Sequence, residues 1–287
     1  MNGKRQSVVL SGIPETMLWT LHNRASEAQR PRPLLVDPEA IRILGSIEYD
    51  YARRFGKADR SHAVRSRVFD DVLKPWLAEY PEGVVIELGC GLETQFQRCD
   101  NGRVRWVCVD VPEAIAVRER FLPERERCRY VRKSVLDLSW MTDVDRFAAA
   151  RPEGRTPPAG PVFVTAQGLF MYLREAEVKT VIGAIAGHFR QAELLFDVIP
   201  HWYSRKTMRG LQKTHAYRVP PMPWSINPAE IERLRGWSPH IAAVEAVPWN
   251  YFSGLGWALL RAVMRLPGLR NAAPSAVRVQ SRRAQPD

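Results

Sequence analysis

The stretch VVIELGCGLETQF, residues 84–96, decides the fold of this chain. Its first part, residues 84–88, is a short and mainly apolar run, which is typical of a buried strand. The run leads directly into a Gly-x-Gly turn at Gly89 and Gly91. Because glycine carries no Cβ, such a turn lets a ligand approach the backbone closely. The stretch therefore predicts a buried strand that ends at a ligand-binding turn.

A second feature, Asp110, tells what kind of ligand the turn receives. It ends the run WVCVD about twenty residues after the turn, where a carboxylate can accept hydrogen bonds from two ribose hydroxyls. A Gly-x-Gly turn alone is as often an ordinary tight turn, so the combination with Asp110 carries the prediction. Thr94 replaces the third glycine of the dinucleotide fingerprint. The pattern therefore predicts a nucleoside cofactor, and it favours S-adenosylmethionine over a nicotinamide dinucleotide.

The middle of the chain alternates short apolar runs with helical stretches, which predicts βαβ units. The expected fold class is α/β, with a doubly wound, mostly parallel sheet. At 287 residues one main domain is expected. The predicted strands are residues 84–88, 104–109, 130–131, 162–164 and 194–199.

The domain organisation follows from the flanking segments. Residues 1–82 are expected to form an N-terminal helical cap, with one helix beginning at Asp37-Pro38 because Asp caps a helix and Pro is tolerated at its first position. Residues 83–257 form the predicted α/β core, and the run at 151–161 is expected to be a surface loop. An irregular segment rich in aromatic and basic residues, at about 200–226, is the predicted lid. Residues 258–287 are expected to be a basic extension.

Composition excludes several classes of protein. Apolar residues make up 45% and charged residues 25%, as in an ordinary globular enzyme. No apolar run approaches the roughly 18 to 20 residues of a membrane span, and the start lacks a secretory apolar region, so a cytoplasmic location is expected. The four cysteines are widely spaced, which indicates buried thiols and neither a disulfide framework nor a metal site.

The net charge of +11 is concentrated at the end of the chain. Residues 258–287 hold six arginines and one aspartate, which is +5 of the total. A basic tail with Pro and Ser is expected to be solvated and partly disordered. The charge therefore does not indicate a nucleic-acid partner by itself.

The decisive stretch and several others resemble the leucine carboxyl methyltransferase-like family, which includes polyketide O-methyltransferases of the tetracenomycin type. ELGCGLETQF resembles the NLGxGLDTRF motif of that family. The resemblance implies a class I methyltransferase fold, S-adenosylmethionine as cofactor and O-methylation of a small molecule in secondary metabolism. It covers roughly residues 14–250, and its further motifs are ETMLWTLHNRA (15–25), LLVDPEA (34–40), AVRSRVFDD (63–71), VTAQGLFMYL (164–173) and PWSINPAEIERLRGW (223–237).

The resemblance also implies roles for individual residues. Arg65 matches the arginine that pairs with the methionine carboxylate, with Arg24 assisting, and Asp137 with Leu138 matches the position that receives the adenine amino group. Gln167 stands where many relatives have glutamate. The predicted cofactor-binding set is Arg24, Arg65, Glu87, Gly89, Cys90, Gly91, Asp110, Val111, Asp137, Leu138 and Gln167.

Three residues depart from the family pattern. Glu93 and Gln95 replace the common Asp and Arg of the motif, and Gln167 removes a negative charge near a cationic cofactor, although an amide still accepts a hydrogen bond. Purely structural interpretations also remain open: Arg65 as a surface arginine, Asp137 as a cap at a strand end, and Gln167 as part of a turn.

The acceptor is less well defined. Methyl transfer is an in-line displacement that mainly needs positioning and exclusion of water. Tyr172, His201 and His215 are candidates for contact with the acceptor or for a general base, and none is certain. An ionised carboxylate needs no base whereas a phenol benefits from one, so the missing base favours a carboxylate. Basic residues between 201 and 218 could steer an anion or simply face solvent.

Three other functions are weighed against this one: an NAD-dependent dehydrogenase, an RNA-directed methyltransferase suggested only by the basic tail, and a cofactor-binding module without activity. None has a motif of its own. The expected partner is a small-molecule acceptor, and the sequence indicates neither its identity nor the oligomeric state.

Overall fold

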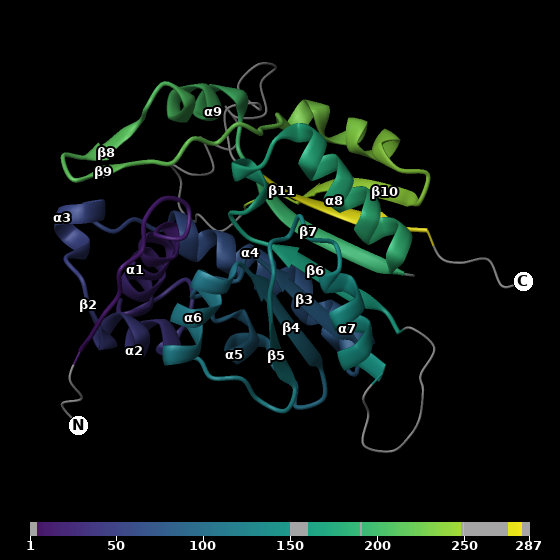
Figure 1. Cartoon of the computed structure of the whole chain (residues 1–287), viewed down its shortest axis with the longest axis horizontal. Coiled ribbons are helices and arrows are strands. Elements are labelled where there is room, and N and C mark those ends of the chain that lie inside the picture. Colours follow the sequence, from purple (N-terminus) through teal and green to yellow (C-terminus); the bar gives the residue numbers. More distant parts are fainter. Residues whose placement is uncertain (1–4, 150–159, 190, 248, 250–274, 283–287) are drawn as a thin grey trace, which may run out of the picture.

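The computed structural model describes residues 5–149, 160–189, 191–247, 249 and 275–282. Its centre is a seven-stranded sheet with the strand order β10-β11-β7-β6-β3-β4-β5 (Figure 1). Strands β3 to β7 pair in parallel, which confirms the predicted sheet. The strands are β3 Val84–Leu88, β4 Arg105–Asp110, β5 Cys128–Arg132, β6 Val162–Ala166, β7 Ala192–Val198, β10 Ile241–Val247 and β11 Ser275–Ser281.

The order of the strands creates a switch point in the sheet. The chain runs from β3 outward to β4 and β5, then returns to the other side of β3 and continues with β6 and β7. The loops that leave β3 and β6 therefore diverge at the carboxyl ends of the strands. In α/β sheets this crevice is where ligands bind.

Helices cover both faces of the sheet, because successive strand residues point to opposite sides. Val84, Ile86 and Leu88 pack with α7 and α8 in one core cluster, and Val85 packs with α4, α5 and α6 in another. The helices of these layers are α4 Ser61–Glu79, α5 Gln95–Cys99, α6 Pro112–Phe121, α7 Trp140–Ala149 and α8 Glu175–His188.

The remaining N-terminal helices and the predicted lid form a third cluster above the crevice. Trp19 of α1 and Phe55 of α3 contact Tyr217 of the hairpin β8–β9, with ring centroids 6.0 and 4.8 Å apart. Figure 1 shows this hairpin beside α3. The elements not yet given are β1 Gln6–Ser7, α1 Thr16–Ala28, α2 Pro38–Ser46, β2 Ile47–Glu48, α3 Tyr51–Phe55, η1 Phe170–Tyr172, α9 His201–Met208, β8 Gln212–Thr214, β9 Tyr217–Arg218 and η2 Pro228–Trp237, of which η2 packs in the first core cluster.

The predicted helix start at Asp37-Pro38 is confirmed. The Asp37 side chain accepts a hydrogen bond of 2.9 Å from the backbone N–H of Ala40, and Pro38 is the first residue of α2. The same carboxylate also accepts from Arg24 at 2.7 Å, so the cap joins α2 to α1.

One expectation about the basic tail is wrong. Residues 275–281 form β11, which lies antiparallel between β7 and β10 inside the central sheet. Ala276, Val277 and Val279 are buried there, and the Arg278 guanidinium pairs with Glu193 at 2.5 Å. Val277 and Val279 alternate with Arg278 and Gln280, and this alternation makes the segment a strand of the sheet, not a solvated extension.

Three further expectations concern a loop, the cysteines and membrane-spanning helices. The predicted loop at 151–161 lies outside them except for its last two residues. All four cysteines are described, and each is buried and free of a disulfide. None of the described helices combines the length and apolar character needed to cross a membrane.

Candidate functional site

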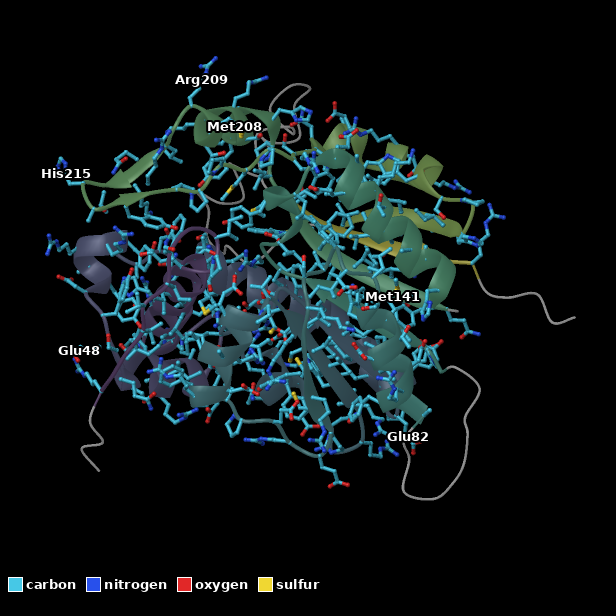
Figure 2. All side chains as sticks on the ribbon, viewed as in Figure 1. Glu48, Glu82, Met141, Met208, Arg209 and His215 are labelled. Carbon is cyan, nitrogen blue, oxygen red and sulfur yellow. The ribbon has the colours of Figure 1, made fainter. Side chains whose placement is uncertain are left out.

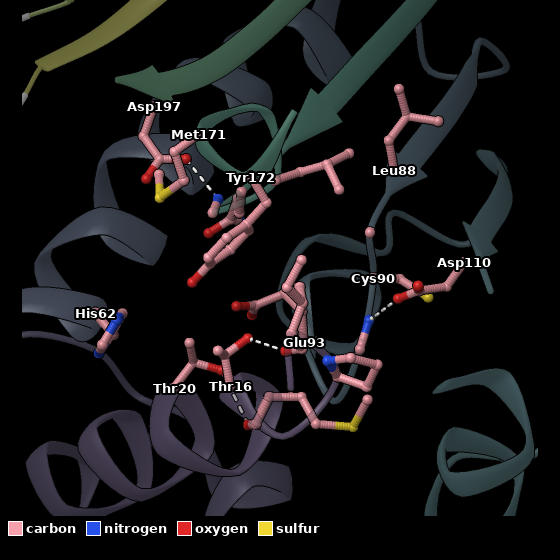
Figure 3. Close-up of a pocket in the computed structure, with 18 of the residues that line it drawn as sticks. Thr16, Thr20, His62, Leu88, Cys90, Glu93, Asp110, Met171, Tyr172 and Asp197 are labelled. Atoms are coloured by element: carbon pink, nitrogen blue, oxygen red, sulfur yellow. Dashed lines mark hydrogen bonds between the residues drawn. The ribbon is translucent and has the colours of Figure 1, made fainter. Parts of the chain in front are cut away.

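A cavity of about 590 Å³ lies at the carboxyl ends of β3, β4, β6 and β7 (Figure 3). Its walls include residues from α1, α4, η1 and α9, so the N-terminal helices and the predicted lid enclose the crevice of the sheet. The volume is within the roughly 300 to 1,000 Å³ typical of small-molecule sites. The topology thus places a cavity of this size where the sequence predicts a ligand.

The glycine turn forms part of this cavity. Gly89 and Gly91 have φ angles of 64° and 41°, which side chains rarely adopt. A Cβ on Gly89 would lie 2.9 Å from Leu169 Cδ1, and one on Gly91 would lie 3.0 Å from Met17 Cβ. Both positions therefore need glycine for the backbone conformation and for the close packing around the turn.

Asp110 lies next to the turn and also lines the cavity. Its two carboxylate oxygens accept hydrogen bonds of 2.8 Å from the backbone N–H groups of Gly91 and Val111. Burial raises the pKa of Asp110 to about 6, against the effect of these two donors. Each oxygen keeps a lone pair, so the carboxylate can accept further hydrogen bonds from a ligand.

Arg65 of α4 brings a buried positive charge to the cavity. Its guanidinium contacts Asp197 of β7, with 3.3 Å between Nη1 and Oδ2. Asp197 also accepts from the backbone N–H of Gly168 at 2.5 Å. The Nε atom of Arg65 is buried without a hydrogen-bond partner among the described residues. This arginine is thus held loosely and has donors left for an anionic ligand.

Arg24 has a different environment and does not line the cavity. Its guanidinium donates to Asp37 at 2.7 Å, to Thr94 Oγ1 at 2.8 Å and to the carbonyl of Leu92 at 2.7 Å. The side chain is fully buried. Arg24 therefore joins α1 and α2 to the loop after the glycine turn, whereas Arg65 lines the cavity.

The two glutamines that depart from the family motifs contact each other. Gln167 Nε2 donates to Gln95 Oε1 at 3.3 Å, and Gln95 Nε2 donates to Asp70 at 3.2 Å. A buried arginine is nevertheless present nearby: Arg98, three residues after Gln95, pairs with Asp70 at 2.7 Å and with Glu93 at 2.8 Å. The two departures therefore contact each other directly. The buried arginine of α5 is Arg98, about one helical turn after Gln95, where the family motif has its arginine.

Asp137 and Leu138 do not line the cavity. Asp137 is exposed, and its Oδ1 accepts from the backbone N–H of Ser139 at 3.1 Å and from its hydroxyl at 2.7 Å. This geometry agrees with the interpretation of Asp137 as a capping residue. Ser134 and Val135, at the start of the same turn, line the cavity instead. Their small and apolar side chains gave no signal in the sequence.

The remaining predicted residues at the strand ends do line the cavity. Glu87, Cys90 and Val111 are among its walls. Burial raises the pKa of Glu87 well above its ordinary value, and its Oε2 accepts from Trp106 Nε1 at 3.2 Å. Burial thus favours the neutral form of the Glu87 carboxyl group.

The three residues predicted to contact the acceptor or act as a base lie in different places. Tyr172 lines the cavity, and burial raises its pKa (Figure 3). His201 lies outside, between Ser225 Oγ and Glu230 Oε2, each at 2.8 Å. His215 is exposed at the tip of the hairpin β8–β9 (Figure 2). Sequence reasoning missed His62, which lines the cavity from the first turn of α4.

The basic side chains of the lid do not line the cavity either. Arg205, Lys206, Arg209 and Arg218 are exposed, and Lys213 pairs with Asp59 at 3.7 Å. Among the described lining residues Arg65 is the one that carries a permanent positive charge. The solvated-face interpretation of the lid charges therefore fits the structure better than steering inside the cavity.

Two solved structures share this fold. A Thermobifida fusca protein provisionally assigned as a methyltransferase matches with a TM-score of 0.53 at 17% identity, over 93% of this chain and 94% of its own. A DUF574 family protein from Streptomyces avermitilis matches with a TM-score of 0.53 at 11% identity, over 92% and 97%. The fold is thus that of the class I methyltransferases.

Sequence comparison then gives the family. The model of the leucine carboxyl methyltransferase family matches residues 17–186, and the chain belongs to this family of S-adenosylmethionine-dependent methyltransferases. The tetracenomycin polyketide synthesis O-methyltransferase TcmP of Streptomyces glaucescens is 35% identical over 70% of this chain and 71% of its own. An S-adenosyl-L-methionine-dependent methyltransferase, dpfgK of Gibberella zeae, is 29% identical over 66% and 67%. The protein is therefore a methyltransferase, and the dehydrogenase alternative is wrong.

Proposed function

We propose that this protein transfers the methyl group of S-adenosylmethionine to an oxygen atom, a carboxylate or a phenol, of a largely apolar, polyketide-like small molecule. The observation that carries the proposal is one continuous cavity with two chemically different ends. Asp110 and Cys90 of the glycine turn lie on one side of the cavity, and Met171, Tyr172 and His62 lie away from them (Figure 3). The polyketide pathway of TcmP supports the same class of acceptor.

The cofactor fits the first end of the cavity. Arg65, with its buried and unpartnered Nε, takes the methionine carboxylate, and Asp110 takes the ribose hydroxyls. The turn at Gly89 and Gly91 gives the methionine chain access to the backbone. Ser134 and Val135 border the adenine, in place of the predicted Asp137 and Leu138. Bound there, S-adenosylmethionine supplies an electrophilic methyl group on a positively charged sulfur.

The acceptor fits the second end. Trp19, Tyr172, Trp202, Tyr203 and Met222 line it, so a flat apolar molecule replaces water there and gains burial of its surface. Residues 200–226 act as the lid, because Trp202, Tyr203 and Met222 all belong to that segment. Exclusion of water strengthens the attraction between the acceptor oxygen and the positively charged sulfur.

A labelled-methyl assay tests the proposal. The purified protein is incubated with methyl-labelled S-adenosylmethionine and a panel of aromatic carboxylic acids and phenols. We expect micromolar cofactor binding, roughly −8 kcal/mol, by calorimetry and label in one or more acceptors. Mild alkali separates the products, because it hydrolyses a methyl ester much faster than an aryl methyl ether.

Two other results would contradict the proposal. Cofactor binding with no methyl transfer to any small molecule would favour the alternative that the protein is a cofactor-binding module without activity. Transfer to RNA, with affinity that falls steeply as salt rises, would favour the RNA-directed alternative.

A further inference from the structure

Arg118 of α6 is a buried arginine that contacts the glycine turn without lining the cavity. Its Nη1 atom donates to three backbone carbonyls: Glu93 at 2.7 Å, Gly91 at 3.0 Å and Cys90 at 3.4 Å. All three acceptor residues line the cavity. Arg118 therefore ties α6 to the backbone of the loop that carries the cofactor turn.

The glycine turn needs such a contact because its own backbone is flexible. Gly89 and Gly91 have φ angles of 64° and 41°, and glycine reaches many other conformations at little cost. A loop that becomes ordered only when a ligand binds loses affinity through the entropy of ordering. Donors fixed on a helix order the loop before the cofactor arrives.

Arg118 and Asp110 hold the same peptide group from its two ends. The carbonyl of Cys90 and the N–H of Gly91 belong to one planar unit. The carbonyl accepts from Arg118, and the N–H donates to Asp110 Oδ2 at 2.8 Å. Figure 3 shows Cys90 and Asp110 close together at the cavity. The orientation of this peptide group therefore helps to set where the Asp110 carboxylate lies.

Arg118 also brings a permanent positive charge under the turn. Beside its Nη2 atom lie Cys108 Sγ at 3.5 Å and Glu87 Oε2 at 3.9 Å, and its Cζ atom lies 5.2 Å from the centre of the Tyr130 ring. A guanidinium is not deprotonated in proteins. A positive charge near a carboxylate favours the ionised form of that carboxylate.

We propose that Arg118 is a positioning residue for the cofactor: it fixes the glycine turn and, through the peptide group between Cys90 and Gly91, holds the ionised Asp110 carboxylate ready for the ribose hydroxyls. This inference rests on the proposed role of Asp110 and extends the cofactor site to a residue outside the cavity. Arg118 acts through the turn and through Asp110, without contact with the cofactor.

The inference makes a statement about the pKa of Asp110. Burial raises this pKa to about 6, and the N–H groups of Gly91 and Val111 and the charge of Arg118 act against burial. Loss of Arg118 removes its charge and loosens the N–H of Gly91. Both changes raise the pKa of Asp110 further, so less of the carboxylate is ionised near neutral pH.

Other groups around Asp110 do not replace Arg118. The negative charge of Glu113, on the same helix, raises the pKa of Asp110. Burial raises the pKa of the Cys90 thiol in the turn. Arg132, the register partner of Asp110 on β5, pairs with Glu119. Arg118 is thus the cation in this part of the described chain that acts on the Asp110 carboxylate.

The first test measures the Kd of S-adenosylhomocysteine by calorimetry from pH 5 to pH 8. Arg118→Met removes the donors and the charge but keeps a long side chain. We expect the Kd at pH 7.5 to increase at least about tenfold, which is roughly 1.4 kcal/mol. The pH midpoint of binding should move upward from about 6 by at least about half a pH unit.

Two matched variants accompany this test. Arg118→Lys keeps the charge but offers one ammonium group in place of the planar fork, so its Kd and its midpoint should lie between those of wild type and Arg118→Met. Arg120→Met, at an exposed arginine of the same helix that donates to Gln6 and Ser7, should change neither quantity.

The second test asks whether Arg118 acts through Asp110. In an Asp110→Asn background, loss of Arg118 should weaken binding less than it does in wild type, because the carboxylate that it positions is absent. Amide hydrogen exchange of residues 89–93 in the unliganded protein should become faster without Arg118. If Arg118→Met does not fold, Arg118→Lys takes its place and must show weaker binding, a raised midpoint and faster exchange.

Two outcomes would overturn the inference: a folded Arg118→Met with the Kd and midpoint of wild type, or weaker binding with an unmoved midpoint and full additivity with Asp110→Asn. The second outcome would make Arg118 a residue of the fold only. A wild-type protein that does not bind S-adenosylhomocysteine would instead remove the proposed cofactor site itself.

Discussion

Arg24 and Arg65 are both buried arginines that the sequence assigns to the same carboxylate, yet their surroundings differ. The Nε atom of each lacks a hydrogen-bond partner among the described residues, but the terminal nitrogens of Arg24 donate to two side chains and a carbonyl, whereas Arg65 has one ion-pair partner at 3.3 Å and lines the cavity. A buried arginine whose terminal N–H groups are engaged away from a cavity stabilises the fold. One with donors to spare in a cavity is free to bind a ligand.

The largest effect is expected for Arg24, the more extensively hydrogen-bonded of the two arginines. Arg24→Ala leaves the buried carboxylates of Asp37 and Glu93 with Arg98 as their remaining charged partner, so it should lower the free energy of unfolding by about 3 kcal/mol or more. Urea unfolding measures this change. Arg42→Ala, which breaks an exposed pair, is the control and should cost under about 1 kcal/mol. A stable Arg24→Ala variant that has lost its cofactor would reverse the assignment.

The next largest effect is expected for Arg65, the arginine that lines the cavity. Arg65→Ala should weaken binding of S-adenosylhomocysteine by about 2 to 4 kcal/mol, through the loss of a charge-assisted contact. Asp197 keeps the N–H of Gly168, so the loss of stability should be smaller than for Arg24→Ala. Calorimetry on the folded variant gives the Kd. An unchanged Kd would show that the two arginines do not differ in the proposed way.

Asp110 should make cofactor binding depend on pH. Its pKa is raised to about 6, and its ionised form accepts best from ribose hydroxyls. The Kd should therefore increase about tenfold per pH unit below pH 6 and level off above pH 7. In the free protein the raised pKa has the opposite sign: stability falls as pH rises from about 4 to 6, because the folded state holds a proton that the unfolded chain has released.

Calorimetry between pH 5 and pH 8 checks this dependence. Asp110→Asn, which cannot titrate, is the control and should bind more weakly at pH 8 with little change across the series. A wild-type Kd that stays flat from pH 5 to pH 8 would show that the carboxylate does not take part.

The smallest effect concerns the glutamine pair. Gln167→Glu alone places a negative charge near Glu93 and Asp70 and should destabilise the fold, whereas the double variant with Gln95→Arg should recover part of the loss as an ion pair. We expect a coupling of about 1 kcal/mol in a double-mutant cycle by urea unfolding. Strict additivity would mean that the two departures from the family pattern are independent.

The strands, the glycine turn and Asp110 were predictable because they are local. Period and spacing within a few residues are enough for a parallel strand that ends in a turn. The strand at 275–281 was harder to predict, because it is short, lies in a basic segment, and pairs with β7 and β10, which end at Val198 and Val247. Its place depends on two edges that exist only after the rest of the sheet has formed.

The side chains of the site are subject to the same limit, because their contacts come from distant parts of the chain. The sequence by itself determined the α/β fold, the family, the cofactor and the residues at the ends of β3 and β4, since these follow the backbone over short distances. Only the tertiary structure decided that the terminal nitrogens of Arg24 are engaged outside the cavity, that Asp137 caps a turn outside the cavity, and that His62 is inside the cavity while His201 and His215 are outside it. Which donors a buried group has left depends on neighbours brought from other elements, and no spacing along the chain encodes that.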